Sequence, residues 1–253
     1  MAKGDFDQSQ NTLHWKDNDG LPVLLSPVVS PHSQRVHSFE LHHLPKAQGG
    51  LSTATHYDLD WGLVKAAVRT ATELQSQDAE APPVTARLSP ETLVDKLFPD
   101  TFRQLLDEHG LSPDQVQLAV TEQSLLDHTV PPASLHQLSD SGVQLILDDY
   151  LSLSSNLHVI QNRNIGVVKL GEPVTAKLHR SEIAQRFVRG LVTLTASVGK
   201  TLVVKGVENQ RQLGFLEACG CRHFQGDYLS SPLPPEKVPQ YLHQVARSGL
   251  PRP

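Results

Sequence analysis

Short aliphatic and β-branched runs alternate with longer amphipathic runs along most of the chain, and this alternation limits the possible folds more than any other feature. The runs with strand character cover residues 23–29, 36–43, 84–89, 116–122, 143–149, 166–171, 201–208 and 223–230. The runs with helical character cover residues 61–75, 91–109, 134–140, 154–162, 181–198, 210–218 and 236–247. Strands that alternate with helices form βαβ units around a parallel sheet. Eight such strands in 253 residues therefore predict an α/β fold, a closed (β/α)8 TIM-like barrel.

The segment 22–44 holds two strands with no room for a helix between them, so the barrel should contain one antiparallel strand. We expect residues 1–20 to form a polar N-terminal tail and residues 21–249 to form a single barrel domain. In the helix predicted over 181–198, apolar residues recur every three or four positions, and we expect this stripe to cover the core. The stripe consists of Ile183, Phe187, Leu191, Leu194 and Val198.

The composition excludes several classes of function. The net charge is −5, from 27 acidic and 22 basic residues, which argues against a nucleic-acid polymer as partner. No apolar run approaches the roughly 18 residues that a membrane span requires, and the polar N-terminus lacks the apolar stretch of a secretory signal. These features predict a cytoplasmic protein. Cys219 and Cys221 cannot form a tetrahedral thiolate zinc site alone, so we expect reduced thiols and no cofactor.

Chemistry in such barrels takes place at the C-terminal ends of the strands, and the residues there are the candidates for function. In the second half of the chain the motifs are Ala119-Val120-Thr121-Glu122, Asp148-Asp149-Tyr150, Lys169-Leu170-Gly171, Lys205-Gly206-Val207-Glu208 and Gln225-Gly226. In the first half they are Ser26-Pro27, Glu40-Leu41-His42 and Arg87-Leu88-Ser89. Taken in order, these motifs resemble those of the EAL family, the cyclic di-GMP phosphodiesterase domain of bacterial signalling. The resemblance implies an EAL-type barrel with one antiparallel strand.

The resemblance also implies a two-metal phosphodiesterase site, because the family's motifs place oxygen ligands at seven strand-end positions. Here Glu40, Asp148 and Asp149 keep a carboxylate. The ligands are lost at Arg87, Ala119, Gly171 and Lys205. With Lys169, the family pattern of six acids and one lysine sums to −5, whereas three acids and three cations sum to zero here. A neutral pocket does not favour two divalent cations, so we expect no metal and no catalysis. Arg87 and Lys205 should instead pair with the three carboxylates.

The nucleotide-binding part of the resemblance is also altered. Glu122, Glu208 and Gln225 are retained, and we expect the two glutamates to cap a helix or brace a loop. Leu151 and Leu153 occupy glycine positions of the family's loop after D-D-F, where we expect leucine to forbid the backbone angles that glycine permits. Together with Leu44, at the arginine of E-A-L-L-R, these leucines are the expected partner surface.

Three functions follow from this sequence. The one favoured is a catalytically inactive EAL-like domain that acts as a regulator through a protein partner. The alternative is a cyclic di-GMP receptor without hydrolysis, in which Arg87, Lys169 and Lys205 contact phosphates and Gln225 contacts a guanine. The remote alternative is an active cyclic di-GMP phosphodiesterase that uses a different set of metal ligands. The sequence names neither the partner nor the oligomeric state.

Overall fold

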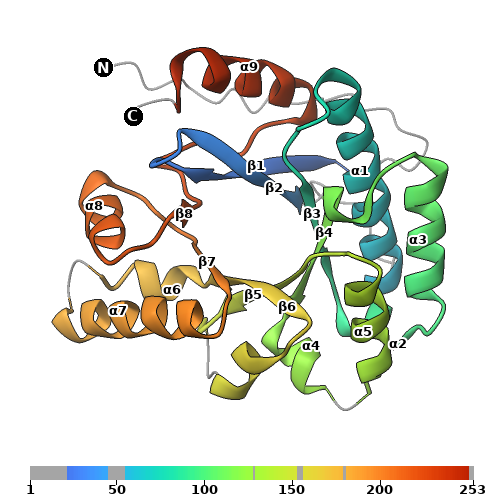
Figure 1. Ribbon diagram of the computed structural model, residues 1–253, viewed down its shortest axis with the longest axis horizontal. Coiled ribbons are helices and arrows are strands. Elements are labelled where there is room, and N and C mark those ends of the chain that lie inside the picture. The colour runs from blue at the N-terminus through green and yellow to red at the C-terminus, as the bar shows by residue number, and fades with distance from the viewer. Residues whose placement is uncertain (1–21, 45–54, 128, 153–155, 179–180, 251–253) are drawn as a thin grey trace.

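The computed structural model describes residues 22–44, 55–127, 129–152, 156–178 and 181–250. Within these ranges eight strands form one closed barrel in the order β1 to β8, with the helices packed around the outside (Figure 1). The strands are β1 (Val23–Ser30), β2 (Arg35–His43), β3 (Val84–Leu88), β4 (Val116–Thr121), β5 (Leu145–Tyr150), β6 (Ile165–Leu170), β7 (Thr201–Val204) and β8 (His223–Phe224). The helices are α1 (His56–Gln77), α2 (Pro90–Val94), α3 (Phe98–Glu108), α4 (Glu122–Leu126), α5 (Pro132–Asp140), α6 (Glu172–Thr175), α7 (Glu182–Ser197), α8 (Gln210–Ala218) and α9 (Val238–Ser248), with 3₁₀ turns at η1 (Pro113–Gln115), η2 (Leu157–Gln161) and η3 (Pro235–Lys237). The predicted TIM-like barrel is confirmed.

The antiparallel strand is β1. It pairs antiparallel with both β2 and β8, while β2 to β8 pair in parallel. The hairpin between β1 and β2 turns in four residues, too few for a crossover helix. Because β1 runs the opposite way, its first residues lie at the barrel end where the other strands finish, and Val23 pairs with His43.

Apolar side chains pack in two clusters, a large one around the barrel wall and a small one in the barrel interior. The main core lies between the strands and the helices and includes Phe39, Phe98 and Phe102. A second, smaller cluster closes the barrel interior and consists of Val28, Ala119, Ile146, Val167 and Val203. Along each strand alternate residues face this interior, so the charged residues that follow at the strand ends are directed into the barrel mouth.

Several sequence-based boundaries were wrong. The helix predicted over 91–109 is broken into α2 and α3, because Asp95 accepts a hydrogen bond from the backbone N–H of Leu97 and competes with the helical pattern. The helix predicted over 154–162 is the 3₁₀ turn η2 in its described part. The last two strands end earlier than predicted, at Val204 and Phe224, and Gly206 beyond the first adopts a left-handed φ of 72°.

The core stripe predicted on α7 was only partly correct, because Leu191 is buried and Leu194 packs against the main core, whereas the other members are exposed. The buried residues of α7 are Val188, Leu191 and Thr195. Ile183 and Phe187 of the predicted core stripe are 80% and 48% exposed. The periodicity was correct, but it cannot separate the part of an apolar arc that the barrel covers from the part that it leaves in solvent.

Asp60 connects α1 to the end of β3, where one of the candidate cations lies. Its carboxylate accepts hydrogen bonds from the backbone N–H and hydroxyl of Ser89 at 2.7 and 2.6 Å, and from the Thr92 hydroxyl at 2.5 Å. Asp60 is 7% exposed. This carboxylate therefore holds the β3–α2 turn directly after Arg87.

Among the described residues, no helix is long and apolar enough to cross a membrane.

We expect Asp60→Ala to lower the free energy of unfolding by about 2–4 kcal/mol, because it leaves the buried Thr92 hydroxyl and the Ser89 N–H without their acceptor. Chemical denaturation measures this loss. Asp58→Ala, which removes only the exposed capping box of α1, should cost about 1 kcal/mol. Equal losses for the two variants would contradict the role given to Asp60.

Candidate functional site: an ion-pair cluster in the barrel mouth

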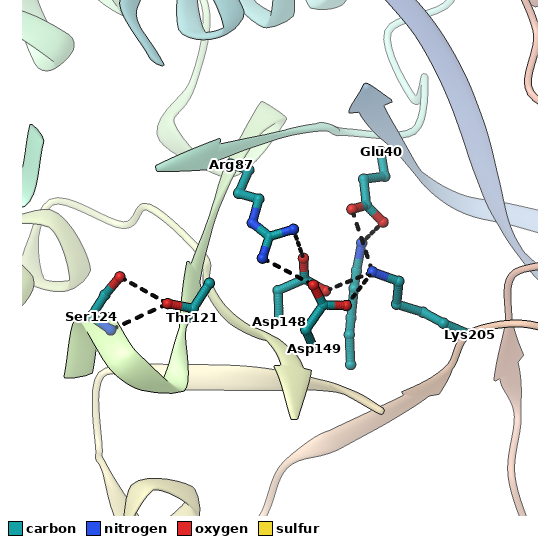
Figure 2. Close-up of polar contacts among 8 residues, drawn as sticks. Glu40, Arg87, Thr121, Ser124, Asp148, Asp149 and Lys205 are labelled. Carbon is teal, nitrogen blue, oxygen red and sulfur yellow. Dashed lines mark hydrogen bonds and ion pairs between the residues drawn. The ribbon is translucent and has the colours of Figure 1, made fainter. Parts of the chain in front are cut away.

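Six charged side chains from the ends of five strands converge at the C-terminal mouth of the barrel, and all of them except Lys169 are labelled in Figure 2. They are Glu40 of β2, Arg87 of β3, Asp148 and Asp149 of β5, Lys169 of β6 and Lys205 directly after β7. We call this set the mouth cluster. Because neighbouring parallel strands place their ends side by side, residues far apart in sequence come within contact distance here.

Lys205 lies at the centre of the mouth cluster. Its Nζ is 3.1 Å from Asp148 Oδ1 and 2.8 Å from Asp149 Oδ1, and both are hydrogen bonds. A third carboxylate oxygen, Glu40 Oε1, is 3.9 Å away. The predicted pairing of Lys205 with all three retained acids is therefore confirmed.

The other two cations complete the cluster on opposite sides. Lys169, which is 1% exposed, donates to Glu40 Oε2 at 3.0 Å. The Arg87 guanidinium lies 2.9 Å from Asp149 Oδ2 and 3.6 Å from Asp148 Oδ2. The predicted pairing of Arg87 is confirmed for these two aspartates. The side chain of Arg87 remains 43% exposed, so its outer edge faces solvent.

Burial and neighbouring charge act against each other on the acids. Burial alone would raise the pKa of Glu40, but the charges of Lys169 and Lys205 outweigh it and hold the pKa below its usual range. Burial also opposes ionisation of Asp149, yet the contacts with Lys205 and Arg87 lower its pKa. For Asp148, burial and the nearby Glu40 carboxylate raise the pKa, against the effect of Lys205. Burial and Glu40 therefore oppose ionisation of Asp148, whereas Lys205 favours it.

The cations respond in the opposite sense. Burial alone would lower the pKa of Lys205, but Glu40 and the two aspartates raise it above its usual range. The pKa of Arg87 is likewise raised by Asp148 and Asp149 against the effect of burial. Both cations therefore keep their protons at neutral pH, and the formal charges of the mouth cluster sum to zero.

Sequence reasoning missed His42, which lies close enough to the mouth cluster to interact with its charges. Its pKa is lowered by burial, and the charges of Glu40 and Lys205 act on it as well. His42 follows Glu40 by two positions on β2, and residues two apart on a strand point to the same face. That spacing was the signal that could have identified it.

Comparison with known proteins identifies the family to which this fold belongs. The model of the EAL domain matches residues 12–232. The chain belongs to the EAL domain family. Among solved structures, the EAL domain of Mycobacterium smegmatis DcpA superposes with a TM-score of 0.80 at 22% identity, over 92% of this chain and 100% of that one. Klebsiella pneumoniae BlrP1 in a calcium and cyclic di-GMP complex gives a TM-score of 0.76 at 25% identity, over 85% of this chain and 56% of that one.

Curated relatives include proteins named for signalling and for cyclic di-GMP hydrolysis. An uncharacterized signaling protein of Caulobacter vibrioides is 29% identical over 60% of this chain and 19% of its own length. The cyclic di-GMP phosphodiesterase PdeR of Escherichia coli is 25% identical over 60% of this chain and 23% of its own length. The chain thus spans about a fifth of the length of these relatives.

The EAL family implies a metal site, and the residues of the mouth cluster do not fit one. Lys205 Nζ lies among the three carboxylates, in the place where a metal ion bound by all three would have to lie. In the part of the chain that the structure describes, no group of three or more His, Cys, Asp or Glu side chains is arranged to hold a metal ion. A divalent cation at this place would also meet the full charge of Lys205 at short range.

The two uncharged replacements add to this misfit. Ala119 is fully buried in the apolar cluster with Ile146 and Val203, so a carboxylate there would enter an apolar layer. At Gly171 the added Cβ of an acidic residue would collide with the side chain of Ser152. An acidic side chain would therefore be buried among apolar groups at position 119 and would lack space at position 171.

The residues retained from the family's motifs lie in different environments. Glu122 begins α4 and accepts a hydrogen bond from the backbone N–H of Asn156, so it braces the loop after β5 as expected. Glu208 is exposed, and Asn209, not Glu208, caps α8. Thr121 caps α4 through Ser124 (Figure 2). Gln225 is 6% exposed, and its Oε1 is buried without a hydrogen-bond partner.

The expectation about the leucine loop was partly wrong. Leu151 adopts a left-handed φ of 66°, so leucine at this glycine position accepts the special backbone angle rather than forbidding it. Its side chain packs against the main core, which offsets the conformational cost of about 1–2 kcal/mol. Leu153 lies outside the described residues. Leu44 follows β2 and Leu151 follows β5, so two strands separate them around the barrel.

We expect Lys205→Glu to destabilise the protein by about 3–5 kcal/mol, because it removes the central partner of the aspartates and adds a fourth acid. It should not create hydrolysis of cyclic di-GMP, because the other replaced ligands remain absent. The melting temperature measures stability, and Lys177→Glu, at an exposed lysine outside the mouth cluster, is the matched charge change. A rise in melting temperature for Lys205→Glu would contradict the pairing.

The contribution of Asp149 should depend on pH. Because its pKa is lowered in the folded protein, its ionised form stabilises the fold at neutral pH, and that stabilisation is lost as the pH falls through the folded pKa. Asp149→Asn should cost about 1–3 kcal/mol at pH 7 and progressively less below about pH 4. Urea unfolding of both proteins across this range measures the difference. A cost that does not change with pH would refute the ionic role.

Proposed function

We propose that this chain is a catalytically inactive EAL domain, a pseudo-phosphodiesterase that acts in bacterial signalling through a protein partner. One observation carries the proposal: Lys205 Nζ lies 3.1 and 2.8 Å from the aspartates that the family motif would use for metal. A side-chain cation and two further cations balance the three retained acids, so the pocket offers divalent ions little net attraction.

The loss of catalysis follows from the chemistry of the reaction class. Two-metal hydrolysis of a phosphodiester uses cations to stabilise the attacking and leaving oxygens. Lysine and arginine supply charge but no open coordination position, and here their charges are already paired with acids. In the mouth cluster the three retained carboxylates are therefore already paired with side-chain cations, and no cation of the cluster is left unpaired to replace the action of a metal.

We also propose that the protein works in the cytoplasm and that its partner contacts the outer surface rather than the mouth. The support is that some relatives sharing the domain are named signaling proteins, and that this domain retains a closed eight-stranded barrel.

A hydrolysis assay tests the central part of the proposal. The chain is incubated with cyclic di-GMP and either Mg²⁺ or Mn²⁺, and an EAL-family phosphodiesterase serves as positive control. We expect no linear dinucleotide above the background of the Asp148→Asn variant. Turnover by the wild type that Asp148→Asn abolishes would show that the domain is an enzyme.

One observation favours a second function, a non-hydrolysing receptor for cyclic di-GMP. The outer edge of Arg87 is exposed in a pocket of about 630 Å³, lined also by Glu122 and Asp149. The buried Oε1 of Gln225 is an acceptor without a partner. Against this function, all three cations of the mouth cluster already contact carboxylates, which a phosphate would have to displace.

Calorimetry with cyclic di-GMP separates the two functions. The pseudo-phosphodiesterase proposal expects no heat of binding up to submillimolar ligand, with or without Mg²⁺. Binding that is weakened at least tenfold by Arg87→Ala, and not by Arg103→Ala on the exposed face of α3, would favour the receptor instead.

A further inference from the structure

Two histidines meet at the end of the barrel opposite the mouth cluster. The imidazole rings of His37 on β2 and His223 on β8 lie 4.2 Å apart between centroids, with 39° between their planes. β2 and β8 are not neighbours in the sheet, because β1 lies between them. The ring contact therefore joins the two strands that flank the single antiparallel strand.

The local structure of both strands brings these rings together. The register of β1 with β2 shifts after Val28, so that His37 has no partner on β1 and is the extra residue of a β-bulge. A bulge turns a side chain away from the regular alternation of a strand. On β8, Phe224 packs in the main core, so His223, one position earlier, points to the opposite face, toward the barrel interior. There it pairs in register with Val203, a member of the apolar interior cluster.

None of the described strands supplies an acidic side chain to this end of the barrel, because their acidic residues all belong to the mouth cluster. Burial of part of its ring and the charge of Lys169 lower the pKa of His37. Burial and the neighbouring His37 lower the pKa of His223 to about 4. Both rings are therefore neutral at pH 7, and a proton on either one would have no carboxylate to face.

The other charges near the pair do not compensate a proton either. Arg35, two positions before His37, is exposed, and Arg222, directly before β8, donates a hydrogen bond to the carbonyl of Cys221. On the outer side of β2, the helices α1 and α9 pack against the strand. Their titratable residues toward this end, Glu73, His243 and Arg247, are exposed on the surface.

The seam between β8 and β1 is where the barrel has the least backbone pairing. β8 is two residues long, and one residue pair, Val29 with Phe224, joins it to β1. The next shortest ladders, β2 with β3 and β7 with β8, have two pairs each. In the described part of the chain, one isolated bridge between Leu25 and Leu233 supports β1 further along the same side. The contact between the two histidines therefore spans the weakest seam of the sheet.

We propose that His37 and His223 form an acid-sensitive latch on this seam. While both imidazoles are neutral, their contact holds β8 against β1. When both take up protons, two positive charges face each other beneath Lys169, and the seam opens. This proposal is independent of the proposed loss of catalysis.

Backbone hydrogen bonds connect the latch to the mouth cluster. Gln225, directly after β8, donates from its N–H to the carbonyl of Val204 at 2.9 Å, and its own carbonyl accepts from the N–H of Val207 at 3.1 Å. These two bonds enclose the segment that carries Lys205. Opening of the seam therefore loosens the backbone that positions the central cation of the mouth cluster.

The pH range of the latch follows from the direction of the shifts. A free imidazole has a pKa of about 6.5, and the folded chain resists protonation of both rings. The stabilisation of the seam is therefore complete above about pH 6.5, and it is lost as the pH falls from there toward the folded pKa of His223, about 4. Each histidine can raise the equilibrium constant for opening by up to about tenfold per pH unit in this range.

Hydrogen exchange followed by mass spectrometry tests the latch in the full chain. Protection factors, corrected for intrinsic exchange, are compared at pH 7.5 and pH 5.0 for residues 221–229 and for β4 as internal reference. We expect the protection of residues 221–229 to fall at least tenfold in the wild type, and that of β4 to fall much less. In the double variant His37→Gln/His223→Gln, whose side chains cannot be protonated there, the fall should be less than twofold.

His32→Gln is the matched control, because it removes an exposed histidine from the turn between β1 and β2, and it should behave as the wild type. Equal losses of protection in the wild type and the double variant would overturn the latch. So would a wild type in which β4 and residues 221–229 lose protection together, because the whole barrel would then be opening.

A second measurement reads the imidazoles themselves. The ring protons of the wild type are titrated by NMR from pH 8 to pH 4, and the pair is identified by the nuclear Overhauser contact between its rings, so the result does not depend on a variant that folds. We expect both rings of the pair to titrate at least one pH unit below the free value of about 6.5. Midpoints of about 6.5 for both rings, or the absence of the contact between them, would overturn the proposal and leave the proposed inactivity untouched.

Discussion

The contact between the Lys205 ammonium group and three carboxylates is the interaction on which the barrel mouth depends. Glu40, Asp148 and Asp149 come from two strands on different sides of the mouth, and at neutral pH their charges would repel one another across a partly buried space. Lys205 lies within 4 Å of all three. Its effect is visible in the direction of the pKa shifts, since it lowers the pKa of Glu40 and Asp149 and is itself held protonated.

Such a cluster stabilises the fold only while it is complete. Buried ion pairs gain little over apolar packing of the same volume, but removing one partner leaves a charge uncompensated in a low-dielectric site. The family pattern solves the same electrostatic problem with metal cations bound by acids. In this chain the positive charges that balance the acids belong to lysine and arginine side chains, so the barrel mouth requires no bound ion to fold. In the proposed function this exchange has a chemical cost, because an ammonium group offers no open coordination position for an oxygen ligand.

The fold followed from the sequence because alternating strands and helices admit few closed arrangements, and the hairpin at 22–44 identified the antiparallel strand. The pairing of Lys205 followed from charge counting at strand ends. Other features depended on tertiary context. Asp95 ends a helix by a local side-chain hydrogen bond, Leu151 adopts a left-handed conformation because packing offsets its cost, and part of the apolar arc of α7 lies beyond the surface that the barrel covers. Periodicity alone does not distinguish an apolar residue that contacts the core from one that faces solvent.

Manganese binding tests the substitution of metal cations by side chains most directly. Mn²⁺ is titrated into the wild type, and the free ion is measured by its electron paramagnetic resonance signal. The account predicts no stoichiometric binding below millimolar Mn²⁺, and the same weak background for the wild type and Asp148→Asn. One or two Mn²⁺ ions bound per chain at micromolar concentration, and lost in Asp148→Asn, would contradict it.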